Sequence, residues 1–243
     1  MTAGSGLRDL CQGGMPMVVP SVWDLAGAQV ALRLGAPAVS VGWCAAPDAD
    51  RFDPALVFER LKELVGGVAA VVQLPLSVDV EDGFAASPSL VAEHVKALLE
   101  LGISGITLCD QNENASLMAA KIECIKTAAL SAGLDLFVDA RTDVFLCQAE
   151  DDQARVAEVI RRAAIYERAG ADGLYVPGIG EEDELRAVIE AIGLPLDVIF
   201  CRGLLPVSTT LSPMALGCLG VKRLTTGAGV EQLLMRRLEA LAD

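Results

Sequence analysis

Eight short runs of apolar residues recur along the chain and alternate with longer segments of helical character. Between them, apolar residues return at the spacing of one helix face, as at Leu90, Val91, Val95, Leu98 and Leu99. Strands separated by helices form parallel βαβ units, because a short turn cannot join parallel neighbours. The predicted strands are Met17–Val19, Ala38–Val41, Leu76–Val80, Gly105–Cys109, Leu136–Ala140, Gly173–Val176, Leu196–Phe200 and Arg223–Thr226.

A quasi-repeat precedes several of these strands. It reads Leu-Gly-Ala-Pro-Ala-Val from residue 34, Leu-Gly-Ile-Ser-Gly-Ile from 101 and Ala-Gly-Ala-Asp-Gly-Leu from 169. The pattern predicts an α/β protein, a (β/α)₈ TIM barrel that occupies residues 1–243 as a single domain, with strands from near residue 17 to near residue 227. A doubly wound open sheet is the alternative, but no G-x-G-x-x-G follows the first strand. Four glycines predict left-handed helix ends, namely Gly102, Gly133, Gly170 and Gly193.

Composition excludes several classes of partner. The 243 residues include 33 acidic and 19 basic side chains, a formal net charge of −14, which argues against binding to nucleic acid or anionic membranes. The start of the chain lacks the pattern of a signal peptide, and the apolar run Leu64–Val72 is too short to cross a bilayer. The seven cysteines are scattered and contain no Cys-x-x-Cys pair. This pattern is typical of reduced thiols and not of a disulfide framework or a zinc site. We therefore expect a cytoplasmic protein.

Charged side chains gather at the predicted carboxyl ends of the strands, where barrel enzymes carry their active sites. Asp79 and Glu81 lie two residues apart, so on an extended strand end both point toward the barrel axis. Paired carboxylates suit Mg²⁺ or Mn²⁺. The guanidinium of Arg141 suits a carboxylate or phosphate of a substrate. The residues alone leave a second interpretation open, in which these three side chains form a structural ion pair that caps the barrel.

Five segments resemble those of one enzyme superfamily, in the same order and on successive strands. They are Val19-Pro-Ser-Val-Trp-Asp24, Ser77-Val-Asp-Val-Glu-Asp-Gly-Phe84, Cys109-Asp-Gln111, Ala140-Arg-Thr-Asp143 and Tyr175-Val-Pro-Gly178. The chain resembles the isocitrate lyase/phosphoenolpyruvate mutase superfamily, including its phosphonomutase-like and oxaloacetate decarboxylase-like members, from about Pro16 to Gly229. This resemblance implies a barrel that makes or breaks C–C or P–C bonds next to a 2-oxo acid through a metal-stabilised enolate.

The resemblance also implies roles for individual residues. Asp79 matches the direct ligand of Mg²⁺ (or Mn²⁺), and Glu81 matches the carboxylate that holds metal-bound water. Asp48 matches a second acid of this kind and a catalytic residue, and Arg141 matches the catalytic arginine that clamps the substrate carboxylate. Backbone N–H groups of Val41, Gly42 and Trp43 match the turn that contacts the 2-oxo acid.

Two departures from the superfamily pattern shape the expected activity. Cys109 stands where the family has a glutamate, so the resemblance implies a place beside the water bound to the metal. The family's lyases carry a gating loop with a K-K/R-C-G-H signature, where this chain has only Asn112-Glu-Asn-Ala-Ser116. These departures argue against an isocitrate or methylisocitrate lyase. They favour a lyase, decarboxylase or phosphonomutase-like enzyme for a small 2-oxo acid. A non-catalytic barrel that binds small carboxylates is the alternative.

Three further expectations concern other parts of the chain. Thr225-Thr-Gly-Ala-Gly229 is interpreted as a packing turn, although a phosphosugar barrel would use Gly227–Gly229 to bind phosphate. His94 is expected on a solvated helix face. The segment from Val230 to Leu241 reads as the helix that closes the barrel, which predicts a monomer or an unswapped homodimer.

Overall fold

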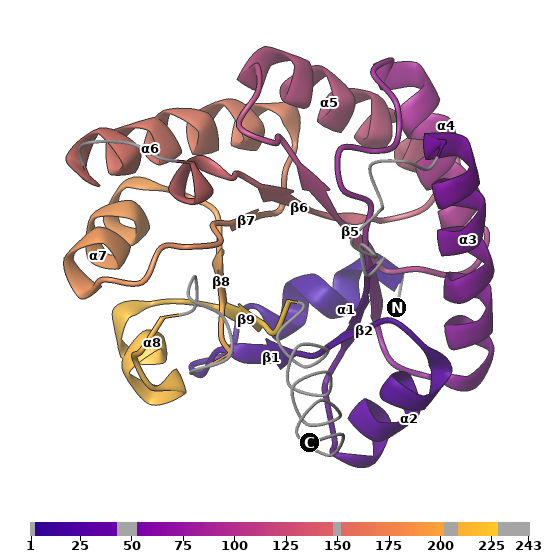
Figure 1. The fold of residues 1–243 in the computed structure, drawn as a ribbon, viewed down its shortest axis with the longest axis horizontal. Helices are drawn as coiled ribbons and strands as arrows, with labels where there is room; N and C mark the ends of the chain where they lie inside the picture. Colours follow the sequence, from indigo (N-terminus) through magenta and orange to yellow (C-terminus); the bar gives the residue numbers. More distant parts are fainter. Residues whose placement is uncertain (1–2, 43–52, 148–151, 202–208, 228–243) are drawn as a thin grey trace, which may run out of the picture.

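The computed structural model describes residues 3–42, 53–147, 152–201 and 209–227. Nine parallel strands form one sheet in the order β1-β9-β8-β7-β6-β5-β4-β3-β2, so that its two ends meet and close a barrel (Figure 1). The strands are β1 (Met17–Val19), β2 (Ser21–Val22), β3 (Val39–Val41), β4 (Leu76–Asp79), β5 (Gly105–Cys109), β6 (Phe137–Arg141), β7 (Gly173–Tyr175), β8 (Leu196–Ile199) and β9 (Arg223–Thr225). The predicted (β/α)₈ barrel is confirmed.

The ninth strand arises because Pro20 interrupts the first one. Proline lacks the N–H that a ladder hydrogen bond needs. β1 on one side of Pro20 pairs with β9, and β2 on the other side pairs with β3. The backbone N–H of Ser40 donates to the Pro20 carbonyl at 2.9 Å, which keeps the two halves in one sheet. Of these two halves, only Met17–Val19 was predicted as a strand.

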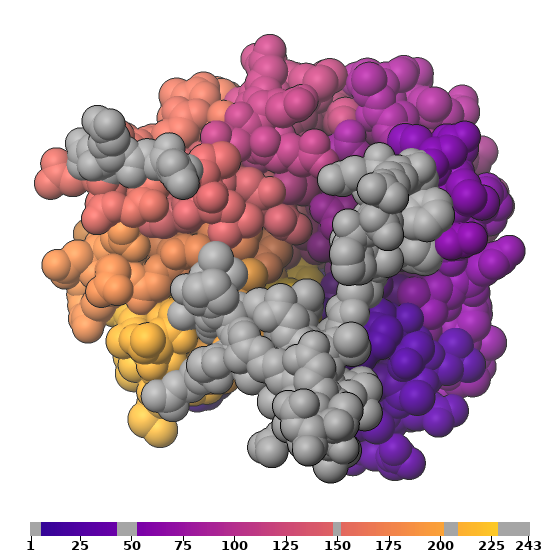
Figure 2. Space-filling view, in the orientation of Figure 1, coloured from indigo at the N-terminus to yellow at the C-terminus, as the bar shows by residue number. Residues whose placement is uncertain are grey.

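Helices cover the outside of the barrel (Figure 1). They are α2 (Leu25–Arg33), α3 (Pro54–Val71), α4 (Pro88–Leu99), α5 (Ala115–Ser131), α6 (Asp152–Ala169), α7 (Glu182–Ala191) and α8 (Pro213–Leu219), with a 3₁₀ turn at Val144–Leu146. In the space-filling view the segments from α3 to α7 lie side by side around the rim (Figure 2). No helix in the described ranges is long and apolar enough to cross a membrane.

An additional helix, α1 (Ala3–Leu10), packs against the amino-terminal end of the barrel. Its Leu7 is fully buried in a small apolar cluster with Met17, Val19 and Phe137. Gly105 of β5 leaves room for it, because a Cβ atom at this glycine would lie 2.7 Å from Leu7 Cδ1. The end of the barrel opposite the candidate site is therefore closed by apolar packing.

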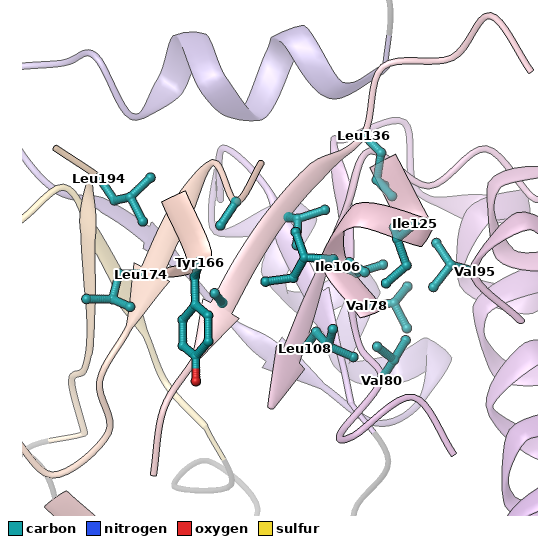
Figure 3. Packing of buried hydrophobic residues seen from close by; sticks show 14 of the residues in the cluster. Val78, Val80, Val95, Ile106, Leu108, Ile125, Leu136, Tyr166, Leu174 and Leu194 are labelled. Atoms are coloured by element: carbon teal, nitrogen blue, oxygen red, sulfur yellow. The ribbon is translucent and has the colours of Figure 1, made fainter. Parts of the chain in front are cut away.

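The main core lies between the strands and the helices. Alternate strand residues point outward, and Val78 and Ile106 face Val95 of α4 and Ile125 of α5 (Figure 3). Burying one such side chain fully contributes roughly 1.5–3 kcal/mol. The outward direction of these residues fixes the inward direction of their strand neighbours, because successive side chains alternate.

The barrel interior is polar at its centre, whereas barrel interiors usually hold branched apolar side chains. Arg223 lies between two carboxylates, with NH1 3.1 Å from Asp139 Oδ2 and Nε 3.0 Å from Asp197 Oδ2. All three residues are at most 2% exposed. Burial raises the pKa of Asp139 to about 8, despite the nearby guanidinium, and it also raises the pKa of Asp197. One cation thus faces two acids inside the barrel.

The prediction of left-handed helix ends holds at three of the four glycines. Gly102, Gly133 and Gly170 have φ of +86°, +70° and +101°. Gly193 has no positive φ, and the prediction there is wrong: α7 ends at Ile192 in an extended conformation with φ of −109°. The nearest side chain to this glycine is Glu167, whose flexible carboxylate end would have to move for a Cβ atom, since Oε1 would lie 2.3 Å from it.

Candidate active site

Three neighbouring strands end in polar side chains that point into the barrel mouth. Asp79, Cys109 and Arg141 are the last residues of β4, β5 and β6, and Cys109 pairs in register with Arg141. Their predecessors Val78, Leu108 and Ala140 belong to the outer core. The alternation of strand side chains therefore directs Asp79, Cys109 and Arg141 inward, toward one another.

Arg141 is held in a fixed orientation by Asp143. Its Nε lies 2.7 Å from Asp143 Oδ1 and its NH2 3.2 Å from Oδ2, a two-point contact. The remaining corner, NH1, lies 3.8 Å from Asp79 Oδ2 and 3.9 Å from Glu81 Oε2. Both distances exceed that of a hydrogen bond. Although burial opposes the charge, Asp79 and its neighbours raise the pKa of Arg141, so the guanidinium stays positive.

The negative charges of Asp79 and Glu81 are only partly balanced by Arg141. Burial raises the pKa of Asp79. The negative charge of Asp79, together with burial, raises the pKa of Glu81 to about 7. Asp79 Oδ1 accepts a hydrogen bond from the Glu81 N–H at 3.0 Å, while Oδ2 lies 3.8 Å from Arg141 NH1. This donor set fits a divalent cation, which would supply the missing positive charge through oxygen ligands.

The backbone at Glu81 differs from the expectation of an extended strand end. β4 ends at Asp79, and Glu81 adopts a left-handed conformation with φ of +49°. Its carbonyl accepts a hydrogen bond from the Cys109 N–H at 2.6 Å, which ties the loop to β5. Both carboxylates nevertheless lie within 4 Å of Arg141 NH1. Within the described ranges, no three His, Cys, Asp or Glu side chains are grouped so as to hold a metal ion.

Cys109 lies at the site as a neutral thiol. The side chain is 2% exposed, and Sγ lies 3.3 Å from Asp143 Oδ2, to which it donates. The Gln111 N–H donates to the same sulfur at 3.2 Å. Burial raises the pKa of this thiol well above its ordinary value, which disfavours a thiolate. The thiol therefore adds a hydrogen bond to the Arg141–Asp143 pair and no charge.

Of the other predicted site residues, Val41 and Gly42 lie within the described ranges, and Trp43 and Asp48 do not. Val41 is fully buried in the outer core, and the Gly42 N–H donates to the Val22 carbonyl at 3.2 Å. Gly42 is adjacent to the carboxylates, because a Cβ atom there would lie 3.7 Å from Asp79 Cβ. Trp43 and Asp48 lie outside the described residues, so their predicted roles stay predictions.

Two predictions concern residues outside the barrel mouth, His94 and the glycine turn. His94 is only half-buried rather than solvated: its ring stacks on Phe58 at 4.1 Å between centroids, and Nδ1 lies 2.9 Å from the Gly83 carbonyl. The expectation of a solvated face is wrong, because α3 packs against this side of α4. In the glycine turn, Thr226 Oγ1 accepts a hydrogen bond from the Ser21 N–H at 2.9 Å, which is a packing contact. Ala228, Gly229 and the predicted closing helix lie outside the described ranges.

Sequence reasoning missed two residues that shape the site. Asp143 orients Arg141 directly, as described above. Tyr175, the last residue of β7, lies with its ring centroid 5.8 Å from the Arg141 guanidinium carbon, and burial keeps the pKa of its hydroxyl well above the usual value. The signal was present in the alternation of the strands: Asp139 with Arg141 and then Asp143, and Gly173 with Tyr175, occupy every second position.

Comparison with known proteins places the chain in a family. Residues 7–243 match the sequence pattern described as phosphoenolpyruvate phosphomutase. The chain belongs to the phosphoenolpyruvate phosphomutase family. The predicted superfamily and the predicted lyase-type enzyme are thereby confirmed.

Three relatives illustrate the likeness. An uncharacterized protein of Mycobacterium tuberculosis is 30% identical over 91% of this chain and 81% of its own. The oxaloacetate decarboxylase of a Bradyrhizobium species is 30% identical over 72% of this chain and 63% of its own, so the match spans somewhat less than two thirds of that enzyme. A crystal structure of a "putative phosphonomutase" from Burkholderia cenocepacia superposes with a TM-score of 0.89, at 31% identity, covering 99% of this chain and 97% of the other.

Proposed function

We propose that this protein is a divalent-metal-dependent lyase for a small 2-oxo acid, which breaks a bond of the carbon next to the 2-oxo group and leaves an enolate, with oxaloacetate decarboxylation as the reaction to test first. The single observation that supports it most is the placement of Arg141 NH1 between two under-compensated carboxylates, 3.8 Å from Asp79 and 3.9 Å from Glu81. This arrangement places two carboxylates suited to a cation beside a guanidinium suited to an anion, at the mouth of the barrel.

Asp79 and Glu81 are the residues that would hold Mg²⁺ or Mn²⁺. Bound there, the ion would polarise the 2-oxo group and stabilise the negative charge that develops as the adjacent bond breaks. Arg141 would bind the substrate carboxylate through NH1, the corner that Asp143 leaves available. Asp143 fixes the guanidinium before the substrate arrives. Arg141 therefore loses little conformational freedom when the substrate binds. Asp48 and Trp43 are proposed partners of the same substrate, whereas the Gly42 N–H is engaged by the Val22 carbonyl and Gly42 only borders the site.

The size of the substrate follows from the loop after β5. Only Asp110–Asn114 separates β5 from α5, and Asp110 is buried within it by bonds to neighbouring elements. A segment this short cannot fold over a large substrate as a gating loop does. A small and less enclosed 2-oxo acid therefore fits better than isocitrate or methylisocitrate.

A direct screen tests the proposal. The purified protein is stripped of metal and incubated with oxaloacetate, phosphonopyruvate or 2-methylisocitrate, each with and without Mg²⁺ or Mn²⁺. We expect metal-dependent turnover of oxaloacetate above a protein-free blank that contains the same ion. Turnover that survives chelation, or none with any of the three acids, would contradict the proposal. The remaining alternative would then be the barrel that binds small carboxylates without cleaving them.

A further inference from the structure

Two buried cations lie behind the barrel mouth, on helices that contribute nothing to the site described so far. Lys121 on α5 is 5% exposed and Arg162 on α6 is 6% exposed. Such residues are almost never buried unless they are paired. Lys121 contacts the loop after β4, and Arg162 contacts the loop after β5.

Lys121 contacts the loop after β4. Its Nζ donates to the Asp82 carbonyl at 2.6 Å and lies 3.8 Å from the Asp82 carboxylate. Asp82 directly follows Glu81, whose left-handed φ of +49° is unfavourable for a residue with a Cβ atom. Such a conformation persists only where the surroundings hold it. Lys121 holds the peptide group that follows Asp82, one residue beyond Glu81, and so fixes the turn from which the Glu81 side chain projects.

Arg162 contacts the loop after β5. Its NH1 donates to Asp110 Oδ2 at 2.7 Å, and its Nε donates to Glu158 at 2.7 Å. The Tyr166 hydroxyl donates to the same Asp110 oxygen at 2.6 Å, and this hydroxyl points along the strands toward their carboxyl ends (Figure 3). Both donors are on α6, so the helix holds the Asp110 side chain at two points.

Asp110 passes this constraint to the arginine of the site. Its Oδ1 accepts a hydrogen bond from the Asp143 N–H at 3.2 Å, and its own N–H donates to the Arg141 carbonyl at 3.0 Å. Asp143 in turn holds the Arg141 guanidinium at two points. An unbroken series of hydrogen bonds thus runs from Arg162 through Asp110 and Asp143 to Arg141.

We propose that Lys121 and Arg162 are positioning residues with separate tasks. Lys121 holds Glu81 in place for the divalent cation, and Arg162 holds Arg141 in place for the substrate carboxylate. Neither side chain touches the cation or the substrate. This inference rests on the proposed function, because it assigns the two loops to the two halves of that site.

The first arm of the test measures metal binding. Lys121→Met is compared with Lys126→Met, a matched control on the same helix. Lys126 also donates to a carbonyl, that of Leu136 at 2.9 Å, but at the opposite end of the barrel beside Asp172. By calorimetry without substrate, we expect Lys121→Met to weaken Mn²⁺ binding about tenfold and the control to stay within about twofold of wild type. Should the methionine variant fail to fold, Lys121→Gln carries the same comparison.

The second arm measures binding of oxalate, a small dicarboxylate that can bind without being cleaved, at saturating Mn²⁺. Arg162→Met is compared with Arg161→Met, whose side chain pairs with Glu158 on the solvent side of the same helix. We expect Arg162→Met to weaken oxalate binding about tenfold while Mn²⁺ binding stays within about twofold. Tyr166→Phe, which removes only one hydroxyl from the series, should shift oxalate binding in the same direction by less. It also carries the test if Arg162→Met is unfolded.

The outcomes separate the inference from the proposed function. Wild-type protein that binds neither Mn²⁺ nor oxalate would refute the proposed function, and this inference with it. Wild-type binding of both, with unchanged affinities in Lys121→Met and Arg162→Met, would refute the inference alone. Equal losses of Mn²⁺ and oxalate affinity in both variants would also overturn it, because the residues would then support the fold in general and not separate halves of the site.

Discussion

Replacing Asp143 by asparagine removes one of the two hydrogen bonds that orient the Arg141 guanidinium. Asparagine has the shape of aspartate, but one of its two terminal atoms is an NH₂ group, which cannot accept a proton from arginine. Either the 2.7 Å contact with Nε or the 3.2 Å contact with NH2 is therefore lost, together with the negative charge. The Cys109 thiol loses its anionic acceptor at the same time.

The size of the effect follows from the burial of the pair. The side chains of Arg141 and Asp143 are 18% and 16% exposed, so solvent screens their contact only weakly. A hydrogen bond to a charged group contributes roughly 1.5–3 kcal/mol, and about 1.4 kcal/mol corresponds to a factor of ten. We expect kcat/KM for oxaloacetate to fall roughly 10- to 100-fold. Most of the loss should appear in KM, because Arg141 binds the carboxylate before and during the reaction.

Steady-state kinetics at saturating Mn²⁺ measures this effect. Glu182→Gln is a suitable control. Glu182 forms a salt bridge with Arg186 on the exposed face of α7, and neither residue contacts the described residues of the site. The control should leave kcat/KM within about twofold of wild type. A KM in Asp143→Asn equal to that of wild type, in a protein with an unchanged thermal melt, would refute the assigned role of Asp143.

Three further predictions follow from the same geometry. Asp79→Ala removes the inner carboxylate and should abolish both Mn²⁺ binding by calorimetry and turnover; retention of either contradicts the metal site. Cys109→Glu adds a hard oxygen donor and should raise Mg²⁺ affinity about tenfold, while lowering the melting temperature of the metal-free protein, because it places another carboxylate beside Asp143. In a folded Cys109→Glu protein, unchanged affinity argues that Asp79 and Glu81 only form an ion-paired cap. Asp139 has a pKa of about 8 in the folded protein and about 3.9 when unfolded, so its contribution to the free energy of unfolding falls as pH rises from about 4 to about 8. Asp139→Asn should therefore gain stability relative to wild type across that window in urea titrations, and a difference independent of pH would show that Asp139 is ionised throughout.

The periodicity of the sequence was sufficient to predict the barrel, because each strand is buried between helices and an interior and reads as a short apolar run. It could not locate the break at Pro20, since Met17–Val19 and Ser21–Val22 pair with opposite neighbours only once the barrel closes. Gly193 shows the same limit. Its position after a helix resembles that of Gly102, but α7 ends without a left-handed residue there, which depends on how the chain enters β8 and not on the glycine itself.

The candidate site was predicted in part for a similar reason. Asp79, Glu81, Cys109 and Arg141 lie in segments that resemble the superfamily, and the structure brings them together at one end of the barrel. The role of Asp143 depends on the direction of two side chains relative to each other. The contacts of Lys121 and Arg162 depend on how α5 and α6 pack behind the loops. Residue spacing places Asp143 two positions after Arg141, but it encodes neither the two-point contact between them nor the packing of α5 and α6.

A crystal of the wild-type protein soaked with Mn²⁺ and oxalate would test the central claim most directly, since Mn²⁺ can be located by its anomalous scattering. We predict a single peak about 2.1 Å from an oxygen of Asp79, close to the distance of a hard divalent ion from a carboxylate. Glu81 should lie near water on that ion, and Arg141 NH1 should donate to oxalate. A peak elsewhere, or oxalate bound without contact to Arg141, would contradict the account.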